Sequence, residues 1–499
     1  MDVNPKHVTL AEHPEISIRK EKLFNDVDLN GRRTKIVCTM GPTSSSESQL
    51  LNLLDNGMCV ARFNFSHGDH TSHGKTLQTL RDALKKRPKL TVATMLDTKG
   101  PEIRTGKLKD GKKVEINQNS VFKITTDYEY VGNENMIACS YSYLNELQIG
   151  QKILIADGSL ETEVVKVEKD GVMVVALNSA TIGEKKNMAL PGVEIKLPAL
   201  AENDINDLVN FGIPQGVDMI AASFVRKASD VREIRKVLGE AGKKIKIVSK
   251  IENHEGLSNF EEILQESDAI MVARGDLGME IPFEKVFIAQ KYMIDLANLK
   301  GKPIIVATQM LESMITNSRP TRAEITDVAN AVLDGCDCVM LSGETANGAF
   351  PQKAVESMAR ICVQAEICIN YNYLLGAIIK SSNLTKQESQ ITEIVESSKV
   401  NGIVVLSKTG RSIQLVAKFK PQKFVYGVTA DETHLRNYQL IRAVRPVHVQ
   451  SLDSDDVITK AFEKIVSNGY LKKGDKVHLV KSKDEDNENF SLEIEERTL

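Results

Sequence analysis

The alternation of short apolar runs with helical stretches is the feature that most restricts the fold of this chain. From Lys35 the pattern reads strand, helix, strand, helix and strand, and after Leu200 it resumes with five further strands. Strands that are separated by helices form parallel sheets, since a parallel crossover needs a connection of about a dozen residues. Eight such units predict a closed (β/α)₈ TIM barrel. The expected strands are Lys35–Met40, Cys59–Ser66, Leu90–Asp97, Asp218–Phe224, Ile245–Glu252, Ala269–Ala273, Pro303–Met310 and Cys338–Ser342.

A segment of different character lies between the third and fourth strands. From Glu102 to Leu200, short alternating runs are separated by Asp-Gly dipeptides, which are typical of turns that join antiparallel strands. These turns are Asp110-Gly111, Asp157-Gly158 and Asp170-Gly171. They predict an inserted β-barrel lid domain, and the pattern beyond Tyr371 predicts an open, mostly parallel α/β domain. The expected domains are an N-terminal arm at 1–33, the barrel at 34–101 and 201–370, the lid at 102–200 and the C-terminal domain at 371–499.

Composition and charge argue against several classes of protein. A net charge of -3 gives no general attraction to nucleic acid or to anionic membranes, and no apolar run reaches the length of a membrane span. The N-terminal residues are polar and do not resemble a signal peptide. The seven cysteines are odd in number and lack a zinc-binding spacing, which favours a reducing compartment. A cytoplasmic enzyme is therefore expected.

The strand expected at Ile245–Glu252 carries the most informative side chains. Since side chains alternate across a strand, Lys250 and Glu252 share one face with Val248. The next strand is followed by Asp276, which places a second carboxylate at the carboxyl end of the same sheet, where barrels of this type bind substrates. Two carboxylates beside a lysine favour a hard divalent cation, Mg²⁺ or Mn²⁺. The alternative is a buried Lys–Glu ion pair that fills the barrel interior.

The strand expected at Cys59–Ser66 carries a row of polar side chains. Alternation places Arg62, Asn64 and Ser66 on one face. Such a row is costly in a core but suits a mouth that binds an oxyanion, because the planar guanidinium of Arg62 matches a phosphoryl group. Asp97 ends the next strand, and a single carboxylate beside neutral oxygens indicates a monovalent cation. The alternative is a hydrogen-bonded polar layer.

Further polar residues follow the other strands. Arg104 lies at the junction with the lid and is expected to meet a polyphosphate as the lid closes, unless it is an ordinary solvated arginine. The hydroxyl groups of Thr308 and Ser342 suit proton relay or the binding of a substrate carboxylate, and the alternative role of each is a helix cap. Glu344 is expected to add a carboxylate to the mouth, and backbone N–H groups near Gly275 are expected to hold an anion.

Six long motifs carry a resemblance to a known family. They are FNFSHG at Phe63–Gly68, LDTKGPEIRTG at Leu96–Gly106, SKIENHEG at Ser249–Gly256, MVARGDLG at Met271–Gly278, ATQMLESM at Ala307–Met314 and MLSGETANG at Met340–Gly348. Together they resemble pyruvate kinase from about Thr34 to the C-terminus.

The resemblance implies phosphoryl transfer from phosphoenolpyruvate to ADP, followed by protonation of the enolate to pyruvate, in a cytoplasmic, glycolytic homotetramer. It implies a need for Mg²⁺, and glutamate at position 102 implies dependence on K⁺. The roles that it implies are catalysis by Lys250, Arg62, Thr308 and Ser342; substrate binding by Arg62, Lys250, Gly275, Asp276 and Thr308; nucleotide binding by Asn64, His67, Arg104 and Lys186; Mg²⁺ binding by Glu252 and Asp276; and K⁺ binding by Asn64, Ser66, Asp97 and Thr98.

The final domain resembles the effector domain of the family only in part. Residues Ser407, Lys408, Thr409, Gly410, Arg411 and Ser412 join a strand to a helix N-terminus, which is a suitable phosphate-binding loop. In members that fructose bisphosphate regulates, a later Gly- and Arg-rich loop completes this site. Here the stretch Lys481–Phe490 carries Asp484, Glu485, Asp486 and Glu488 instead. We therefore expect weak regulation, or a different phosphorylated effector.

Two alternatives to this function remain from the sequence. A Mg²⁺-dependent lyase or aldolase that forms an enolpyruvate also uses paired carboxylates in a barrel, but it needs neither a lid nor nucleotide contacts. A catalytically silent regulator would keep the fold, although every position expected to act carries a competent residue.

Overall fold

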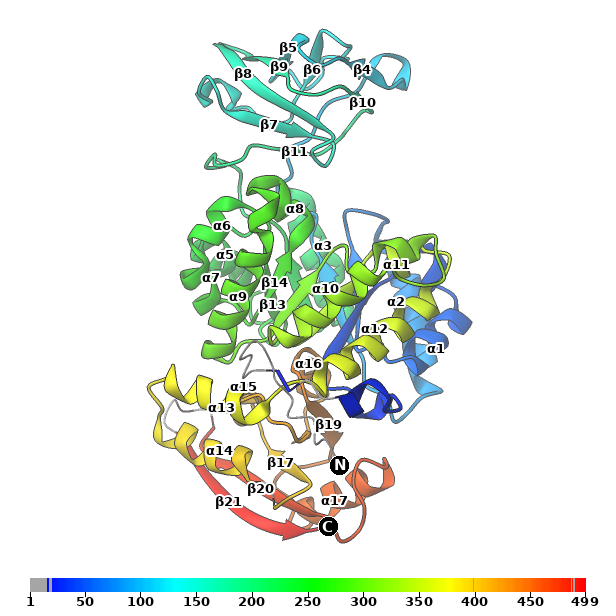
Figure 1. The fold of residues 1–499 in the computed structure, drawn as a ribbon, viewed down its shortest axis with the longest axis vertical. Coiled ribbons are helices and arrows are strands. Elements are labelled where there is room, and N and C mark those ends of the chain that lie inside the picture. Colours follow the sequence, from blue (N-terminus) through cyan, green and yellow to red (C-terminus); the bar gives the residue numbers. More distant parts are fainter. Residues whose placement is uncertain (1–15, 18–19, 398, 486, 488–489) are drawn as a thin grey trace, which may run out of the picture.

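Eight parallel strands close into the predicted barrel, in the order β1-β16-β15-β14-β13-β12-β3-β2. The computed structural model describes residues 16–17, 20–397, 399–485, 487 and 490–499. The barrel lies in the middle of an elongated molecule, with the lid above it and the C-terminal domain below it (Figure 1). The barrel strands are β1 Lys35–Thr39, β2 Val60–Asn64, β3 Ala93–Asp97, β12 Met219–Ala222, β13 Lys246–Ile251, β14 Ala269–Ala273, β15 Ile304–Ala307 and β16 Cys338–Leu341.

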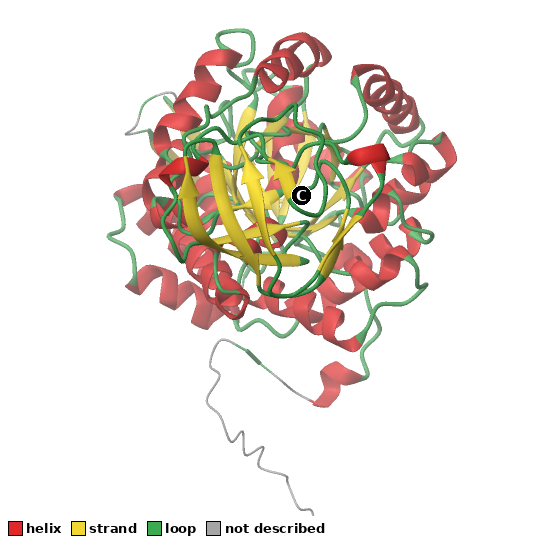
Figure 2. Cartoon of the chain, turned by 90° about the horizontal axis from the view of Figure 1, so that it is seen from above, coloured by secondary structure: helices red, strands yellow, loops and turns green. Residues whose placement is uncertain are grey.

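The alternation of side chains divides the barrel into two apolar layers. Val248, Met95 and Met271 belong to a buried cluster inside the barrel, whereas Ile247 and Ile251 belong to a larger cluster that also contains residues of the helices. Strand β13 is buried on both faces. Because side chains alternate along a strand, Lys250 shares the inward face with Val248, as the sequence predicts. Seen from above, strands occupy the middle of the molecule and helices surround them (Figure 2).

Several helices of the barrel domain begin at a side-chain cap, among them α1, α2, α6 and α10. Helix α2, for example, follows Asp69, whose carboxylate accepts from the backbone N–H of Ser72, and it buries Leu77, Leu80 and Ala83. The barrel-domain helices are α1 Glu47–Asp55, α2 His70–Lys85, α3 Glu202–Asp207, α4 Ile213–Gln215, α5 Ala228–Leu238, α6 His254–Ser258, α7 Phe260–Glu266, α8 Arg274–Glu280, α9 Val286–Lys300, α10 Arg322–Leu333, α11 Gly343–Ala346 and α12 Pro351–Glu366.

The inserted lid is a β-rich module with its own apolar core. Its strands form a six-stranded sheet, β11-β7-β8-β9-β5-β6, and a two-stranded sheet, β10-β4. Asp157-Gly158 joins β7 to β8 and Asp170-Gly171 joins β8 to β9, as predicted. The prediction for Asp110-Gly111 was wrong, because this turn precedes β4 and joins no antiparallel pair. The strands are β4 Val114–Ile116, β5 Val121–Thr125, β6 Met136–Ala138, β7 Lys152–Ile155, β8 Leu160–Glu168, β9 Gly171–Ala176, β10 Ala180–Ile182 and β11 Met188–Ala189.

The C-terminal domain is the predicted α/β sheet, in the order β19-β18-β17-β20-β21, with only β21 antiparallel. Leu440 reaches from this domain into the interior cluster of the barrel and closes its lower end. The elements are α13 Tyr371–Lys380, α14 Lys386–Glu396, β17 Gly402–Leu406, α15 Arg411–Lys418, β18 Val425–Thr429, α16 Glu432–Asn437, β19 Val444–His448, α17 Val457–Ser467, β20 Lys476–Lys483 and β21 Ser491–Thr498.

The N-terminal arm is expected at 1–33, and its residues 1–15 and 18–19 lie outside the described residues, which start at Ile16. Ile16 forms a β-bridge with Ile369, and the ammonium of Lys22 donates to the carbonyl of Ile367, so the described part packs on its own chain. All seven cysteines are free thiols. No helix among the described residues is long and apolar enough to cross a membrane.

Candidate active site

Lys250 lies at the centre of a buried charge cluster at the carboxyl end of the barrel. Its ammonium is 3.0 Å from a carboxylate oxygen of Asp97 and 3.0 Å from one of Glu252, and it donates to the Ser223 hydroxyl at 2.8 Å. Burial by itself lowers the pKa of a lysine, but the two carboxylates outweigh it and raise the pKa of Lys250 above its ordinary value. Lys250 is therefore a fixed positive charge rather than a proton donor.

Arg62 and Asp97 connect this cluster to the neighbouring strands. The Nε of Arg62 donates to the second oxygen of Asp97 at 2.6 Å, and its Nη1 donates to the hydroxyl of Thr39 at 2.8 Å. Burial would raise the pKa of Asp97, but Arg62 and Lys250 together hold it below its ordinary value. Asn64 is the β2 partner of Asp97 in the sheet register. Both oxygens of Asp97 are thus held by side-chain cations at a strand end rich in neutral oxygens.

Glu252 and Asp276 are the two carboxyl groups that the sequence assigns to a divalent cation. Burial raises the pKa of Glu252, Asp276 adds to this effect and Lys250 opposes it, and the resulting pKa is about 7. Burial likewise raises the pKa of Asp276. The charge of Asp276 therefore disfavours the ionised form of Glu252, and a dication would relieve this repulsion. Among the described residues no cluster of three or more His, Cys, Asp or Glu side chains fits a metal.

A cleft of about 340 Å³ opens beside these groups. Arg62, Lys250, Glu252 and Asp276 line it from the barrel side, and lid residues line it from above. The cleft therefore brings most of the predicted site residues together. Besides those four, its lining includes Asn64, Ser66, His67, Lys99, Glu102, Arg104, Asp157, Lys185, Lys186, Asn187, Ser223 and Phe224.

Arg104 connects the two segments of the chain that run between the barrel and the lid. Its guanidinium is 2.6 Å from the carboxylate of Glu102 and donates to the carbonyl of Lys185 at 2.9 Å. Lys186 is exposed at the rim, and its backbone N–H donates to the hydroxyl of Thr105 at 2.8 Å. Arg104 therefore lies at the junction between the barrel and the lid, where its side chain is 31% exposed.

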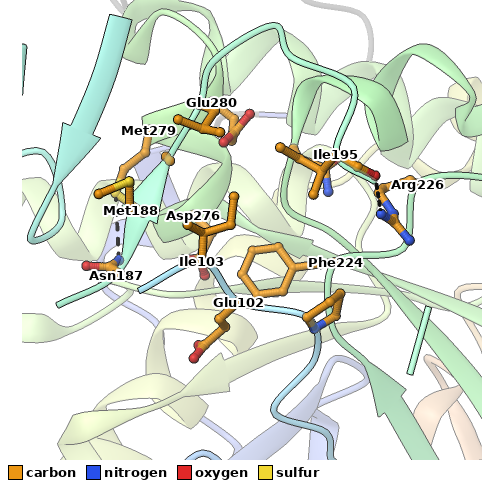
Figure 3. Close-up of a pocket in the computed structure, with 14 residues that line it drawn as sticks. Glu102, Ile103, Asn187, Met188, Ile195, Phe224, Arg226, Asp276, Met279 and Glu280 are labelled. Carbon is orange, nitrogen blue, oxygen red and sulfur yellow. Dashed lines mark hydrogen bonds between the residues drawn. The ribbon is translucent and has the colours of Figure 1, made fainter. Parts of the chain in front are cut away.

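A second, more apolar pocket lies behind the cleft at the same junction, where Ile103, Met188, Phe224 and Met279 gather near Asp276 (Figure 3). Arg226 closes one side of it by donating to the carbonyl of Ile195 at 2.6 Å (Figure 3) and to that of Leu197 at 2.7 Å. These contacts attach the returning lid segment to the barrel.

Thr308 and Gly275 are in close contact beside the mouth, but neither lines the cleft. A Cβ atom placed on Gly275 would lie 2.9 Å from Cγ2 of Thr308, so this position requires glycine. Thr308 adopts a positive φ of 73°. Strained backbone of this kind is concentrated at functional sites.

Ser342 and Glu344 follow β16 and also lie outside the cleft. The expectation that Glu344 adds a carboxylate to the mouth was wrong. Glu344 is fully buried, and its oxygens accept from the backbone N–H groups of Leu311 and Ser342 at 3.0 and 2.7 Å. Its carboxylate braces the loops that follow β15 and β16.

Sequence reasoning missed Ser223 and Phe224. The hydroxyl of Ser223 accepts from Lys250 at 2.8 Å, and its single proton faces the carbonyl of Thr98 at 2.6 Å and Asp97 at 3.2 Å. Phe224 has a positive φ of 54°, and its N–H donates to Glu252 at 2.5 Å. The signal for both was their position directly after the fourth barrel strand, but a single serine there also suits a helix cap.

The residues Ser407–Ser412 lie apart from the mouth, in the C-terminal domain, where they join β17 to α15. They therefore take no part in the mouth of the barrel.

Comparisons with known proteins agree over nearly the whole chain. A family model described as "Pyruvate kinase, barrel domain" matches residues 31–355, and one described as "Pyruvate kinase, alpha/beta domain" matches residues 389–490. The chain is 53% identical over 441 residues to a pyruvate kinase of Eimeria tenella, covering 87% of this chain and 83% of that protein. It is 47% identical over 473 residues to a protein of Glycine max named "Pyruvate kinase, cytosolic isozyme", covering 89% and 92% of the two chains. A crystal structure of a pyruvate kinase from Cryptosporidium parvum superimposes with a TM-score of 0.90 at 46% identity, covering 95% of this chain and 99% of that one.

Proposed function

The chain belongs to the pyruvate kinase family, and from this premise we propose how the residues at the mouth of its barrel divide the reaction among them. The enzyme is a phosphotransferase that moves a phosphoryl group from phosphoenolpyruvate to ADP, giving pyruvate and ATP in the final step of glycolysis. The observation that carries the proposal is the position of Lys250 between Asp97 and Glu252, at 3.0 Å from each, beside a cleft that Arg62 also lines.

Lys250 and Arg62 provide the positive charge that the transferring phosphoryl group requires. The transition state of phosphoryl transfer has little covalent chemistry for a protein to perform, so catalysis rests on positioning and charge. Because its pKa is raised, Lys250 stays protonated while the bond to the enol oxygen breaks, and its charge stabilises the enolate that remains. Arg62, fixed by Asp97 and Thr39, orients the phosphate.

Glu252 and Asp276 are the residues that would hold Mg²⁺ or Mn²⁺, since both are acidic and line the cleft, and the charge of Asp276 contributes to the raised pKa of Glu252. When bound, the dication would supply positive charge that stabilises the negative charge of the phosphate. Asn64, Ser66, Asp97 and Thr98 supply carboxylate, amide, hydroxyl and carbonyl oxygens, a donor set that suits K⁺. Glutamate at position 102 in this family supports dependence on that ion.

His67, Arg104, Lys186 and Asn64 serve the nucleotide in this scheme. All four line the cleft, and Arg104 and Lys186 belong to the segments that connect the lid to the barrel. Movement of the lid would carry both cations toward the phosphates of ADP, which couples closure to nucleotide binding.

Thr308 and Ser342 are proposed to deliver the proton to the enolate carbon through their hydroxyl groups, and Gly275 and Thr308 to bind the carboxylate end of the substrate. Asp276 is proposed to contact the substrate as well. The close packing of Gly275 on Thr308 supports this pairing, since it fixes the start of α8 against the end of β15. Cytosolic localisation rests on the names of relatives such as the soybean protein, and a homotetramer is the assembly that the family implies.

The substitution Lys250→Met tests the assignment of the central cation. We expect kcat to fall by at least about 10³-fold, because one fixed charge is lost from the transition state. A coupled assay with phosphoenolpyruvate and ADP, with and without K⁺, measures this change. Binding of Mn²⁺, followed by electron paramagnetic resonance, should stay largely intact because Glu252 and Asp276 remain.

Lys75→Met on the exposed face of α2 is the matched control, and it should retain normal turnover. Normal rates in Lys250→Met would overturn the assignment. Consumption of phosphoenolpyruvate that did not require ADP would instead favour the enolpyruvate lyase or aldolase.

A further inference from the structure

A carboxylate of the chain itself occupies the anion-binding loop of the C-terminal domain. Strands β17 and β20 are parallel neighbours, with Leu406 opposite Lys481, so the segments that follow them meet at one edge of the sheet. The loop Ser407–Ser412 follows β17, and Glu485 follows β20. The side chain of Glu485 is only 4% exposed and lies within this loop.

Five donors hold the carboxylate of Glu485. One oxygen accepts from the hydroxyl groups of Ser407 and Ser412, both at 2.6 Å, and from the backbone N–H of Ser412 at 2.7 Å. The other oxygen accepts from the backbone N–H groups of Lys408 and Thr409 at 2.8 and 2.9 Å. These are the converging N–H and hydroxyl donors that bind phosphate at a helix N-terminus.

The backbone conformation of the loop supports these hydrogen bonds. Gly410 has a φ of 88°, which favours glycine, and its N–H donates to the hydroxyl of Ser407 at 2.8 Å. Burial alone would raise the pKa of Glu485, but the hydroxyl and amide donors outweigh it and hold that pKa below its ordinary value. Glu485 is therefore ionised at neutral pH.

Arg411 fixes the segment that carries Glu485. Its Nη1 donates to the backbone carbonyls of Glu485 and Asn487 at 3.1 and 3.0 Å, and its guanidinium lies 5.6 Å from the ring centre of Phe490. The cation that would otherwise be free to bind a phosphate is thus used to hold the internal carboxylate. Asp486 and Glu488, two of the four acidic residues in the sequence stretch, lie outside the described residues.

We propose that the Ser407–Ser412 loop is an anion site whose ligand is Glu485 of the same chain, so that free phosphate and phosphate esters bind there only after this carboxylate is removed. A tethered ligand competes at an effective concentration of about millimolar or more, without the entropic cost of association that a free anion bears. A phosphate that entered beside Glu485 would also meet a like charge in a buried site. Effector phosphates are therefore excluded, and the domain remains permanently in its ligand-bound form.

Titration calorimetry of inorganic phosphate into the full-length chain tests the proposal. The substitution Glu485→Ala vacates the loop, and we expect this variant to bind about one phosphate per chain more than the unmodified chain binds over the same range. Adding Ser412→Ala to Glu485→Ala should weaken binding at least about tenfold, because a charge-assisted hydrogen bond is lost. Fructose 1,6-bisphosphate as a second probe reports whether the vacated loop accepts an ester.

Glu493→Ala is the matched control, since it removes a carboxylate from the neighbouring strand β21, where Glu493 pairs with the exposed Lys483. It should not create a phosphate site. Equal phosphate binding by the unmodified chain and by Glu485→Ala would overturn the proposal, as would the absence of binding in Glu485→Ala.

Hydrogen–deuterium exchange of the unmodified chain gives a test that does not depend on whether a variant folds. The amides of Lys408, Thr409 and Ser412 donate to Glu485 and should be protected equally with and without phosphate. Fast exchange of these amides, or protection that phosphate increases, would show that Glu485 does not occupy the loop. Neither result bears on the catalytic roles proposed for the barrel.

Discussion

At the scale of single residues, the charges at the barrel mouth depend on one another. Asp97 accepts from both Arg62 and Lys250, and Lys250 in turn lies between Asp97 and Glu252. An isolated ammonium in this buried position would tend to lose its proton, because burial disfavours charge. The two carboxylates reverse that tendency. The function of Lys250 as a permanent cation is therefore a property of the cluster rather than of lysine alone.

Ser223 is expected to position Lys250, since its hydroxyl contacts Lys250 at 2.8 Å and Asp97 at 3.2 Å. Ser223→Ala should lower kcat about 10- to 100-fold, because hydrogen bonds to charged groups contribute about 1.5–3 kcal/mol. The KM for phosphoenolpyruvate should change less, since the charge of Lys250 remains. Steady-state kinetics measures both quantities. Ser258→Ala, which removes an exposed hydroxyl in α6, should leave them unaltered, and a similar loss there would contradict the assignment.

At the scale of elements, the site is assembled from the carboxyl ends of parallel strands and the helices that follow them. Strand β13 contributes Lys250, the turn after it contributes Glu252, and the first turn of α8 contributes Asp276. A parallel barrel brings these ends to one rim, so small shifts of a single helix change the distances between reacting groups.

Gly275→Ala tests how closely α8 must approach β15. The added methyl group would lie 2.9 Å from Thr308, so we expect α8 to shift and kcat/KM to fall about 10- to 100-fold, the equivalent of about 1–3 kcal/mol of overpacking. Gly278→Ala lies in the same helix, where the nearest atom is an ordinary 3.6 Å away in Val286. Kinetics of the two variants should therefore differ sharply, and equal effects would indicate a general loss of helix order.

Asp431 caps helix α16 and links it to the barrel domain. It accepts from the N–H groups of Thr433 and His434, and its carboxylate is 2.5 Å from the ammonium of Lys244. Burial alone would raise its pKa, but Lys244 and the backbone of His434 lower it to about 2.

A carboxyl group whose pKa is lower in the folded state than in the unfolded chain stabilises the folded state at pH values above the unfolded pKa. This contribution is lost as the pH falls toward about 2, the pKa of folded Asp431. Asp431→Ala should therefore lower the local stability of α16 by about 1 kcal/mol at pH 7. The difference should shrink below about pH 4, the ordinary range for aspartate. Hydrogen exchange of the α16 amides, corrected for intrinsic rates, measures it. A difference independent of pH would show that lost packing, rather than charge, is responsible.

At the scale of the whole molecule, buried ion pairs attach the C-terminal domain to the lower end of the barrel. Arg436 of α16 donates to Asp218 at 2.7 Å, and Lys420 contacts Asp337 at 3.0 Å. Asp218 is almost fully buried and also accepts from Thr94. These contacts lie at the opposite end of the barrel from the catalytic cleft. They attach the C-terminal domain to the barrel.

Arg436→Ala should destabilise the protein by about 3 kcal/mol, because it leaves the carboxylate of Asp218 buried without its cation. Arg232→Ala, which breaks an exposed ion pair with Glu266, should cost about 1 kcal/mol or less. Calorimetric unfolding of both variants provides the comparison. Equal shifts in Tm would mean that Asp218 finds enough compensation from Thr94.

The sequence by itself determined the barrel, the two added domains and most of the residues that line the cleft. The reason is local: side chains alternate along a strand, and polar residues at strand ends in a parallel sheet must meet at one rim. Lys250 with Glu252, and Arg62 with Asn64, were therefore placed together from the spacing alone.

Only the tertiary structure decided which of these groups bind one another. Asp97 accepts hydrogen bonds from both Lys250 and Arg62, and Ser223 accepts from Lys250. Glu344 is buried and accepts from a backbone N–H group. The contact of Glu485 with Ser412 was equally hidden, because it joins segments that meet only when β17 and β20 pair. Local patterns report the neighbours of a residue along the chain, whereas such contacts depend on closure of the sheet and on burial, which favours the pairing of most polar groups.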